Sequence, residues 1–335
     1  MPASVLEMLA SVLRCHRRCA MLAAIVVLIA VSGLVAAPAY AQSTERVTEK
    51  SFPAVDDGTL TIDAKDGGIL DISSWESPVV HVLVMDRKRN YKVAFEPGDK
   101  ELTVRGSYDG PEAKGVPVDV LFRVEVPRRF NLVLSTENGQ ITITALDGTV
   151  LGRTMRGNIS LSKVVGSVDL KTTAGNIMVL ASRVTGTLRA DRGNINVPVA
   201  PAGIDVETMA GNIVIGSAAG TIRAFTGAGN ITIGPVGGTL QCEAKTGDVE
   251  ALLGSRAGDC DVSTDAGSIT LRLLASYSGA FEVMSKGVPG DRGVECETVG
   301  LVLRGQGPYA GTLGTGEHKV HLRAPQGRVR ILKGK

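Results

Sequence analysis

A glycine followed by a polar residue and then an aliphatic residue recurs every 18 residues between Gly139 and Gly247. Seven copies keep this spacing without a slip, and an eighth follows 20 residues after the seventh. A fixed period this short predicts a chain that is wound into similar coils stacked on one another. The copies are Gly139-Gln140-Ile141, Gly157-Asn158-Ile159, Gly175-Asn176-Ile177, Gly193-Asn194-Ile195, Gly211-Asn212-Ile213, Gly229-Asn230-Ile231, Gly247-Asp248-Val249 and Gly267-Ser268-Ile269.

Each coil can be numbered from its glycine, which is taken as position 0. Positions −7, −5, +2 and +4 hold an aliphatic residue or cysteine in 30 of 32 cases, and the exceptions are Gly152 and Gly186. This alternation has period two, so the segments on both sides of the glycine are expected to be strands with one buried face. Positions −6, −4 and +3 are apolar in only 5 of 24 cases, namely Val133, Leu151, Phe225, Met178 and Val214.

A single coil buries too few side chains to offset the entropy of ordering 18 residues, so the coils must stack at about 4.8 Å per rung.

The columns at the turn fit such stacking. Glycine at position 0 is expected at a sharp corner because it tolerates positive φ. Asparagine at position +1 is expected to form a ladder along the stack; it occurs at Asn158, Asn176, Asn194, Asn212 and Asn230. Threonine at position −3 shares the inward parity, and its hydroxyl can bond to a neighbouring backbone group; it occurs at Thr136, Thr154, Thr172, Thr208, Thr226 and Thr264.

The sequence therefore predicts an all-β protein, a single-chain β-solenoid with 18-residue coils of stacked parallel strands. We expect one solenoid domain over residues 53–335, preceded by a polar linker at 42–52. Within the domain, residues 53–130 should form less regular N-terminal coils, 131–273 the regular repeats, and 274–335 looser C-terminal coils and a cap.

Four stretches are charged or rich in glycine and proline, and they are expected to be loops: 86–100, 107–117, 285–293 and 304–317. The repeat returns once after them, because Val320, Leu322, Ala324, Gly327, Val329 and Ile331 match the coil pattern. We expect this last coil, with Arg328, Arg330, Lys333 and Lys335, to place charge on the end of the solenoid.

Residues 1–41 have the features of a signal peptide. A basic region ends at Arg18, an uncharged run extends from Cys19 to Ala37, and Ala39-Tyr40-Ala41 matches a cleavage signal. Export with cleavage before Gln42 is the expectation. The uncharged run is also long enough for an uncleaved membrane anchor, which stays open as the alternative.

Charge indicates which partners the chain can have, and the cysteines indicate whether it contains a disulfide. Three basic residues and one acidic residue of the 36 and 34 in the chain lie in the leader, so the mature part is neutral, with 33 of each. This balance, with 4% aromatic residues, gives no sign of a nucleic-acid partner. Cys242, Cys260 and Cys296 remain after cleavage, and we interpret all three as small buried apolar residues. Cys242 and Cys260 are expected on neighbouring rungs but two residues out of register, which places them too far apart for an unstrained disulfide.

The glycine–polar–isoleucine turns, the Val126-Pro127-Arg128-Arg129 step and the closing Gly327-Arg328-Val329-Arg330-Ile331 segment resemble a known family. It is the bacterial "putative adhesin" family of β-solenoid envelope proteins with Gly-Asp/Asn-Ile repeats, related to head-GIN and toastrack domains. The resemblance covers nearly all of 53–335. It implies an extracytoplasmic protein that is adhesin-like or senses the envelope, and it supplies no catalytic residues.

Several short motifs of enzymes and metal sites occur in the sequence, but the structure expected around each of them does not support that chemistry. Ser160-Leu161-Ser162-Lys163 matches the S-x-x-K pattern of serine acylases but is expected on a strand rather than a helix. Gly305-Gln306-Gly307-Pro308-Tyr309-Ala310 matches a dinucleotide motif but lacks a following helix. His318 and His321 should face opposite sides of a strand, which makes a poor metal pair. His81 is expected to be exposed.

Two classes of solenoid enzyme were also tested on the sequence. The 18-residue coils lack an aliphatic residue at every sixth position, which excludes hexapeptide acyltransferases. The outward column at position −6 shows no convergence of acidic and basic residues of the kind that a polysaccharide lyase needs; it reads Val133, Leu151, Asp169, Thr187, Asp205, Arg223, Gln241 and Asp261. We therefore assign no catalytic, cofactor-binding or metal-ligating residue and no cofactor.

The leading hypothesis is an exported, non-enzymatic protein of the bacterial periplasm or cell surface. It would present a rigid surface to an unknown macromolecule, either a glycan or an envelope protein, and would touch the membrane only through an uncleaved N-terminus. One alternative is a periplasmic sensor or scaffold module of an envelope-stress system. Another is a glycan-acting enzyme that uses loops at 86–117 and 285–317.

Overall fold

The computed structural model describes residues 45–87, 90–109, 119–286 and 293–334. Residues Glu45–Lys335 form one compact unit. Within the described part of this unit every regular element is a β-strand, which confirms the expected all-β class. The predicted leader at 1–41 lies outside the described residues.

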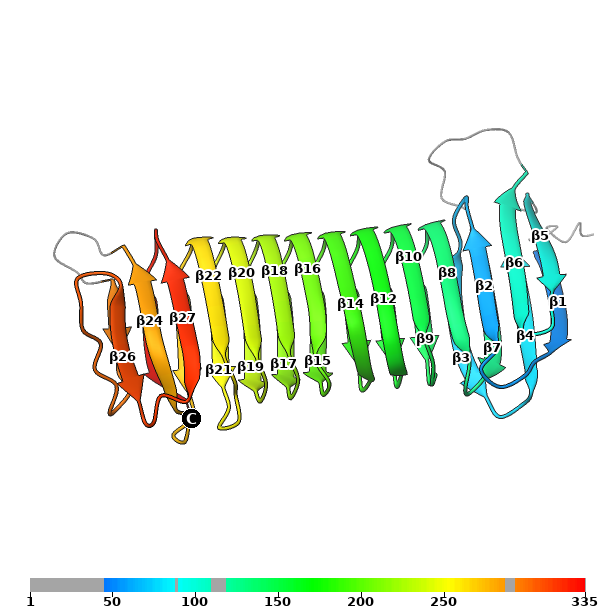
Figure 1. Ribbon diagram of the computed structural model, residues 1–335. Helices are drawn as coiled ribbons and strands as arrows, with labels where there is room; N and C mark the ends of the chain where they lie inside the picture. The colour runs from blue at the N-terminus through cyan, green and yellow to red at the C-terminus, as the bar shows by residue number, and fades with distance from the viewer. Residues whose placement is uncertain (1–44, 88–89, 110–118, 287–292, 335) are drawn as a thin grey trace, which may run out of the picture. The chain divides into compact units, whose positions relative to one another are not determined.

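The strands of the described residues form two long sheets, which we call sheet A and sheet B (Figure 1). In spatial order, sheet A contains β1 (Arg46–Pro53), β4 (Val79–Asp86), β7 (Val120–Pro127), β3 (Ile69–Trp75), β9 (Ile141–Thr144), β11 (Ile159–Ser162), β13 (Ile177–Leu180), β15 (Ile195–Ala200), β17 (Ile213–Ala218), β19 (Ile231–Val236), β21 (Val249–Leu253), β23 (Ile269–Leu273), β28 (Val329–Lys333) and β25 (Val294–Cys296). Sheet B contains β26 (Tyr309–Leu313), β24 (Gly279–Ser285), β27 (His318–Ala324), β22 (Cys260–Ala266), β20 (Leu240–Thr246), β18 (Ile222–Ala228), β16 (Ile204–Ala210), β14 (Arg183–Arg192), β12 (Val165–Ala174), β10 (Val150–Arg156), β8 (Asn131–Asn138), β2 (Thr59–Ala64), β6 (Glu101–Tyr108) and β5 (Tyr91–Pro97).

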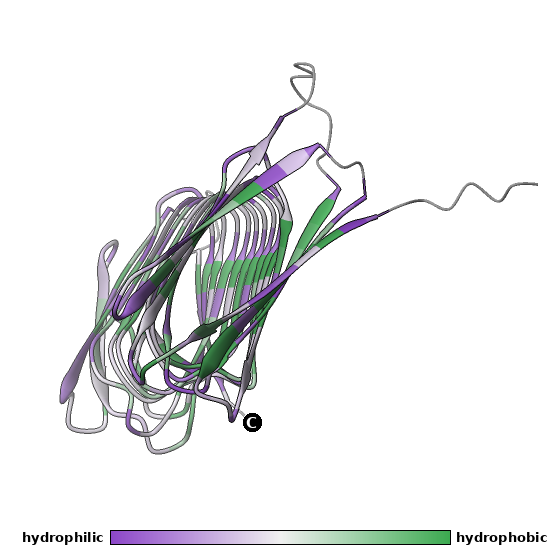
Figure 2. Cartoon of the chain, turned by 90° about the vertical axis from the view of Figure 1, so that its right-hand side faces the viewer, coloured by the Kyte–Doolittle hydropathy of each residue, from purple (hydrophilic) through white to green (hydrophobic). Residues whose placement is uncertain are grey.

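Equivalent residues of successive coils lie side by side, as the period predicts. Ile159 pairs in parallel with Ile177, and Ile177 pairs with Ile195 in the next coil. Each coil gives one strand to sheet B before its glycine and one to sheet A after it. The apolar columns of both sheets are buried in one hydrophobic core. They appear in Figure 2 as hydrophobic bands that run across the stacked strands.

The glycine column is fixed chiefly by the space between coils. A Cβ added at Gly211, where φ is +156°, would overlap the carbonyl oxygen of Gly193 in the preceding coil. Gly267 has a φ outside the left-handed region, yet a Cβ there would overlap the Gly247 carbonyl in the same way. The expected positive φ is therefore present at most of these corners, but close approach of stacked backbones explains the whole column.

The threonine and asparagine columns tie each coil to the one before it. The Thr208 hydroxyl donates to the Gly193 carbonyl oxygen at 2.9 Å, and five further threonines of this column make the equivalent bond. The backbone N–H of Asn194 donates to Oδ1 of Asn176 at 2.8 Å, and the pattern continues along the column. The expected asparagine ladder is therefore present, and its hydrogen bonds run from the backbone N–H of one asparagine to the side-chain oxygen of the asparagine in the preceding coil. Among the described residues no buried side-chain nitrogen or oxygen lacks a partner.

Replacement of a buried column threonine by its isostere tests this hydrogen bond. We expect Thr208→Val to lower the free energy of unfolding by about 1–3 kcal/mol, because it removes the donor to the enclosed Gly193 carbonyl without changing side-chain volume. Chemical denaturation monitored by circular dichroism would measure the change. Thr232→Val on an exposed position of β19 is the control. Equal stability of the two variants would show that the buried hydroxyl contributes nothing.

The regular coils do not extend to the ends of either sheet. At the N-terminal end, β2 and β3 stack directly on β8 and β9, and β6 and β7 form the next coil outward. Beyond them β5, β4 and β1 pair antiparallel. The predicted parallel stack is therefore correct for the coils, whereas the outermost strands reverse direction.

The last coil in sequence is not the last coil in space. β27 pairs with β22 on one side and with β24 on the other (Figure 1). In sheet A, β28 lies between β23 and β25. The expectation that Arg328 and Arg330 charge the end of the solenoid is therefore wrong. The chain first forms the outer strands β24 to β26 and then returns to fill the rung beneath them, so these strands cover the final coil.

Three segments expected to be linker or loop contain strands. Residues 46–52 were expected in the linker but belong to β1, whose backbone pairs with β4 and whose Phe52 packs against the core. β5 lies within the predicted loop 86–100, and β26 lies within 304–317. Most of 107–117 and of 285–293 lies outside the described residues. Edge strands of this kind bury little side chain, so their hydrophobic alternation is weak.

A search of the described residues for a helix long and apolar enough to cross a membrane finds none.

Candidate functional site

The outer faces of the two sheets differ in chemistry. On sheet A, position +3 is uncharged from β9 to β19; it reads Thr142, Ser160, Met178, Asn196, Val214 and Thr232. The strands of sheet B carry 16 of the 23 charged residues between 131 and 273, and nine of these lie at positions −6 and −4, which alternate with buried residues. Binding groups that could orient a polar ligand are therefore concentrated on sheet B.

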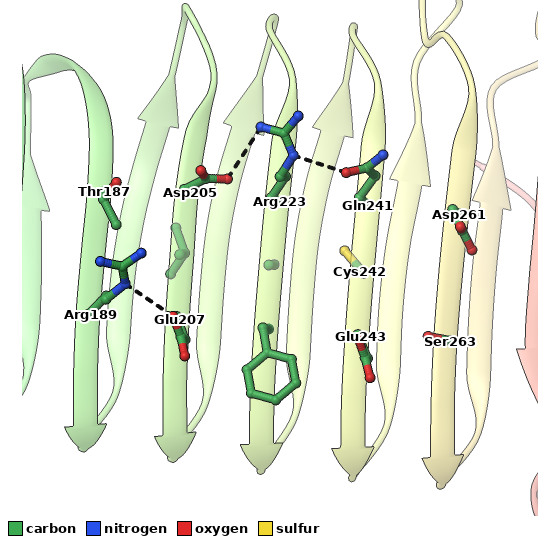
Figure 3. A pocket seen from close by; sticks show the side chains of 13 residues that line it. Thr187, Arg189, Asp205, Glu207, Arg223, Gln241, Cys242, Glu243, Asp261 and Ser263 are labelled. Carbon is green, nitrogen blue, oxygen red and sulfur yellow. Dashed lines mark hydrogen bonds and ion pairs between the residues drawn. The ribbon is translucent and has the colours of Figure 1, made fainter.

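An open depression of about 470 Å³ lies on this outer face of sheet B. It crosses β14, β16, β18, β20 and β22, and each of these strands contributes side chains from positions −6 and −4 (Figure 3). We call it the sheet B groove. Its charged lining consists of Arg189, Asp205, Glu207, Arg223, Glu243 and Asp261.

Ion pairs across neighbouring strands hold these side chains. The Arg189 guanidinium donates from Nε to Oε2 of Glu207 at 3.1 Å. Arg223 donates from Nε to Oε1 of Gln241 at 3.0 Å and lies 3.7 Å from the Asp205 carboxylate on its other side. Each of these charged side chains is about half exposed, so a pair contributes only ~0–1 kcal/mol to folding. Their main consequence is to fix the directions of polar groups on the face.

Phe225 lies in the same groove and is an exception to the pattern of the repeat. It occupies position −4 on β18, with Glu207 beside it on β16 and Glu243 beside it on β20. The regular coils at 131–273 contain no other aromatic residue. The single ring in these coils therefore lies half-buried on the outer face rather than in the core.

A smaller depression of about 190 Å³ continues the groove toward the C-terminal end. It shares Gln241 and Asp261 with the main groove and adds Lys319 and His321 from β27. His321 faces Glu282 of β24 at 3.9 Å. Polar side chains thus continue along the outer face beyond the last regular coil.

This arrangement brings acidic and basic groups together through two columns, whereas the expectation of no convergence concerned position −6 alone. Position −6 alone shows no cluster, but its Asp205, Arg223 and Asp261 lie beside the charged residues of position −4. The two columns form one cluster only when neighbouring coils lie side by side. Two features of the sequence indicate this cluster. They are the outward position of Phe225 and the outward charged residues spaced 18 and 20 residues apart.

The motifs set aside in the sequence remain without a matching site. Ser160 lies on strand β11, and the Gly305–Ala310 segment leads into β26, so neither is followed by a helix among the described residues. His318 stacks on Tyr277, whereas His321 points to Glu282. The described part of the chain contains no group of three or more His, Cys, Asp or Glu residues that could hold a metal ion.

The cysteines and His81 differ in part from expectation. Cys242 and Cys260 are buried free thiols, and burial raises the pKa of both well above the ordinary value. Cys296 is only half-buried, because β25 lies at the edge of sheet A. His81 was expected to be exposed, but its side chain lies between Glu49 at 2.9 Å and Glu125 at 3.3 Å. The unexpected strand β1 supplies Glu49 and explains the difference.

Comparison with known proteins gives no family assignment. No known family profile matches the sequence, and no curated protein matches it. Solved structures that are similar include a "putative cell adhesion protein" from Clostridium sporogenes ATCC 15579, with 12% identity, 86% of this chain and 100% of that chain covered, and a TM-score of 0.24. A "putative adhesin" from Parabacteroides distasonis ATCC 8503 has 14% identity, 68% and 97% coverage, and a TM-score of 0.40.

A third similar structure is a "putative lipid binding protein" from Parabacteroides distasonis ATCC 8503, with 12% identity, 68% and 96% coverage, and a TM-score of 0.35. At these identities and TM-scores the likeness carries no conclusion about the ligand or the activity of this chain.

Proposed function

We propose that the mature chain is an exported, non-enzymatic, adhesin-like β-solenoid that binds a macromolecule of the bacterial envelope on the outer face of sheet B. The observation that carries this proposal is the sheet B groove. It is an open surface about four rungs long, lined by ordered charged groups and one aromatic ring. Its strands are paired on both sides, so the surface is stiff before any ligand arrives.

The exposure and pairing of the carboxylates fit a binding surface. Glu207 pairs with Arg189, and Glu243 pairs with Lys245, and all four side chains are about half exposed. Their oxygen atoms can therefore accept hydrogen bonds from a ligand that lies on this face.

The predicted leader supports export. The expected cleavage before Gln42 leaves only a few residues ahead of β1, which begins at Arg46. The resemblance of the glycine turns to the adhesin family points to the same compartment.

Binding to isolated envelope fractions tests the proposed function. Purified mature chain should bind saturably to envelopes of a strain that lacks the gene, and a double variant with Gln241→Arg and Ser263→Arg should bind about tenfold more weakly or worse, because it fills the groove. The matched control is Ser160→Arg with Thr232→Arg on the exposed face of sheet A, which should bind like wild type. Equal loss in both variants, or no saturable binding by the wild type, would contradict the proposal.

A further inference from the structure

The aromatic ring of Phe225 lies on the outer face of the regular coils, where most of the other outward positions hold polar residues. The inward columns of the regular coils hold aliphatic residues, threonine, cysteine or glycine and no aromatic residue, so these coils do not use aromatic packing in the core. Phe225 instead lies outside the core on β18, between two carboxylates one rung away on each side. The ring is half-buried and lies among the charged side chains of the groove, and aromatic residues bordered by polar groups are typical of binding surfaces.

We propose that the sheet B groove binds a neutral glycan chain that lies across the strands, with Phe225 stacked against the apolar face of one pyranose ring. Glu207, Glu243, Arg223 and Gln241 then hydrogen-bond to the hydroxyl groups at the edges of this ring and its neighbours. This inference rests on the proposed binding function and names the class of ligand for the same surface.

The chemistry of the groove matches that of a sugar. A pyranose presents C–H groups on one face and hydroxyl groups around its rim, so it needs an apolar platform surrounded by fixed donors and acceptors. Phe225 supplies the platform. The network from Asp205 through Arg223 to Gln241 orders the polar groups in advance, which lowers the entropy that binding must remove.

The charge of the groove favours a neutral glycan over an acidic polymer. Its lining holds two arginines, Arg189 and Arg223, against four carboxylates. Both arginines already contact a carboxylate of the groove, so neither is left to balance a ligand anion. Uronate, phosphate and nucleic-acid chains would meet more carboxylates than guanidinium groups in this lining, which disfavours them.

The dimensions of the groove fit a chain of sugars rather than a single one. It extends from β14 to β22, which is about 19 Å at ~4.8 Å per rung. One rung is close to the length of a pyranose unit in an extended glycan, so successive sugars can lie over successive strands. The smaller depression at Lys319 and His321 continues the path by a further rung.

An extended peptide fits the same surface less well. Peptides that bind as added strands need the unpaired backbone groups of a sheet edge. Each strand under the groove, from β14 to β22, already pairs with a neighbour on both sides. The groove therefore offers side chains to its ligand and no free backbone edge.

Titration with defined oligosaccharides tests the proposal. Purified mature chain is titrated by calorimetry with neutral hexasaccharides of glucose, mannose and N-acetylglucosamine, and with a hexamer of galacturonic acid. We expect at least one neutral hexamer to bind, more tightly than its disaccharide, and the acidic hexamer to bind more weakly. Phe225→Ala should weaken the neutral ligand by about tenfold or more, because the stacked ring and its buried area are lost.

Two further variants separate stacking from folding. Phe225→Trp keeps an aromatic platform and should retain affinity within about threefold of wild type. Val214→Ala shortens an exposed apolar side chain on sheet A and should leave affinity unchanged. Circular dichroism and thermal melts should be alike for all three variants. Any loss of binding in Phe225→Ala then reports on the ring itself.

The outcomes distinguish this inference from the proposed function. Binding of neutral glycans that Phe225→Ala leaves intact would overturn the placement of the ligand. Preference for the acidic hexamer, or saturable binding to envelopes with no binding of any neutral glycan, would overturn the ligand class while the proposed function stands. Absence of both envelope and glycan binding would overturn both.

Discussion

A chain that lacks residues 176–193 is expected to fold into a solenoid with one coil fewer. This deletion joins Gly175 to Asn194, so every column keeps its register across the junction. Thr208, which donates to the Gly193 carbonyl in the intact chain, would meet the equivalent Gly175 carbonyl. Stability in such arrays is approximately a sum over repeats and their interfaces, so loss of one internal coil should leave a cooperative fold.

Removal of residues 176–184, half as many, is expected to abolish folding. It takes away β13 and the first two residues of β14, so the chain cannot return to sheet A within that coil. The deleted length is also odd, which turns the following strand residues to the opposite face. Circular dichroism and denaturant melts should show a cooperative transition for the 18-residue deletion and none for the 9-residue deletion. Similar behaviour of the two chains would contradict the stacked-coil description.

The coils were predictable because their physical constraints repeat. Each buried column recurs at one spacing, so a pattern that is weak in a single coil becomes clear over eight. The threonine column shows this well: its inward parity predicted burial and a hydroxyl-to-backbone bond, and Thr172, Thr208 and Thr226 are all fully buried with that bond. Periodicity therefore identified the register as well as the class of fold.

The two ends were not predictable in the same way because their strands occur once. β1 has charged or polar residues on both faces and joins sheet A through its backbone, and β5 is largely exposed. The return of β27 and β28 beneath β24 and β25 has no signature in sequence order, since the coil pattern at 318–333 is the same whether or not strands cover it. The local pattern of apolar residues indicates that a segment is a strand, but it does not indicate the position of that strand along the stack.

The sheet B groove was missed for a related reason. Its charges come from two columns, and Arg223 contacts Asp205 and Gln241 across distances of 18 residues in the chain. A single column examined alone mixes these charges with neutral residues and shows no cluster. Only a two-dimensional map, with coils as rows and positions as columns, brings Phe225 beside Glu207 and Glu243.

Gly211→Val is expected to be among the most damaging single substitutions in the regular coils. Its Cβ would overlap the Gly193 carbonyl in the preceding coil, and the backbone there has φ at +156°. Neither partner can move without separating two paired rungs. We expect the free energy of unfolding to fall by about 3 kcal/mol or more. Ser217→Val in the same coil, on strand β17, should change it by only about 0.5 kcal/mol.

Two alanine variants separate the possible causes of this effect. Gly267→Ala tests close approach alone, since its Cβ would overlap the Gly247 carbonyl although φ lies outside the left-handed region. Gly300→Ala tests backbone conformation alone, because φ is +90° and the nearest atom to the added Cβ is 3.6 Å away. If rung spacing fixes the column, denaturant melts should show a larger loss for Gly267→Ala, at about 2 kcal/mol or more against about 1 kcal/mol for Gly300→Ala. A larger loss of unfolding free energy for Gly300→Ala would contradict this. It would indicate that backbone conformation selects glycine in the column, and that the distance between stacked coils is larger than in the structure.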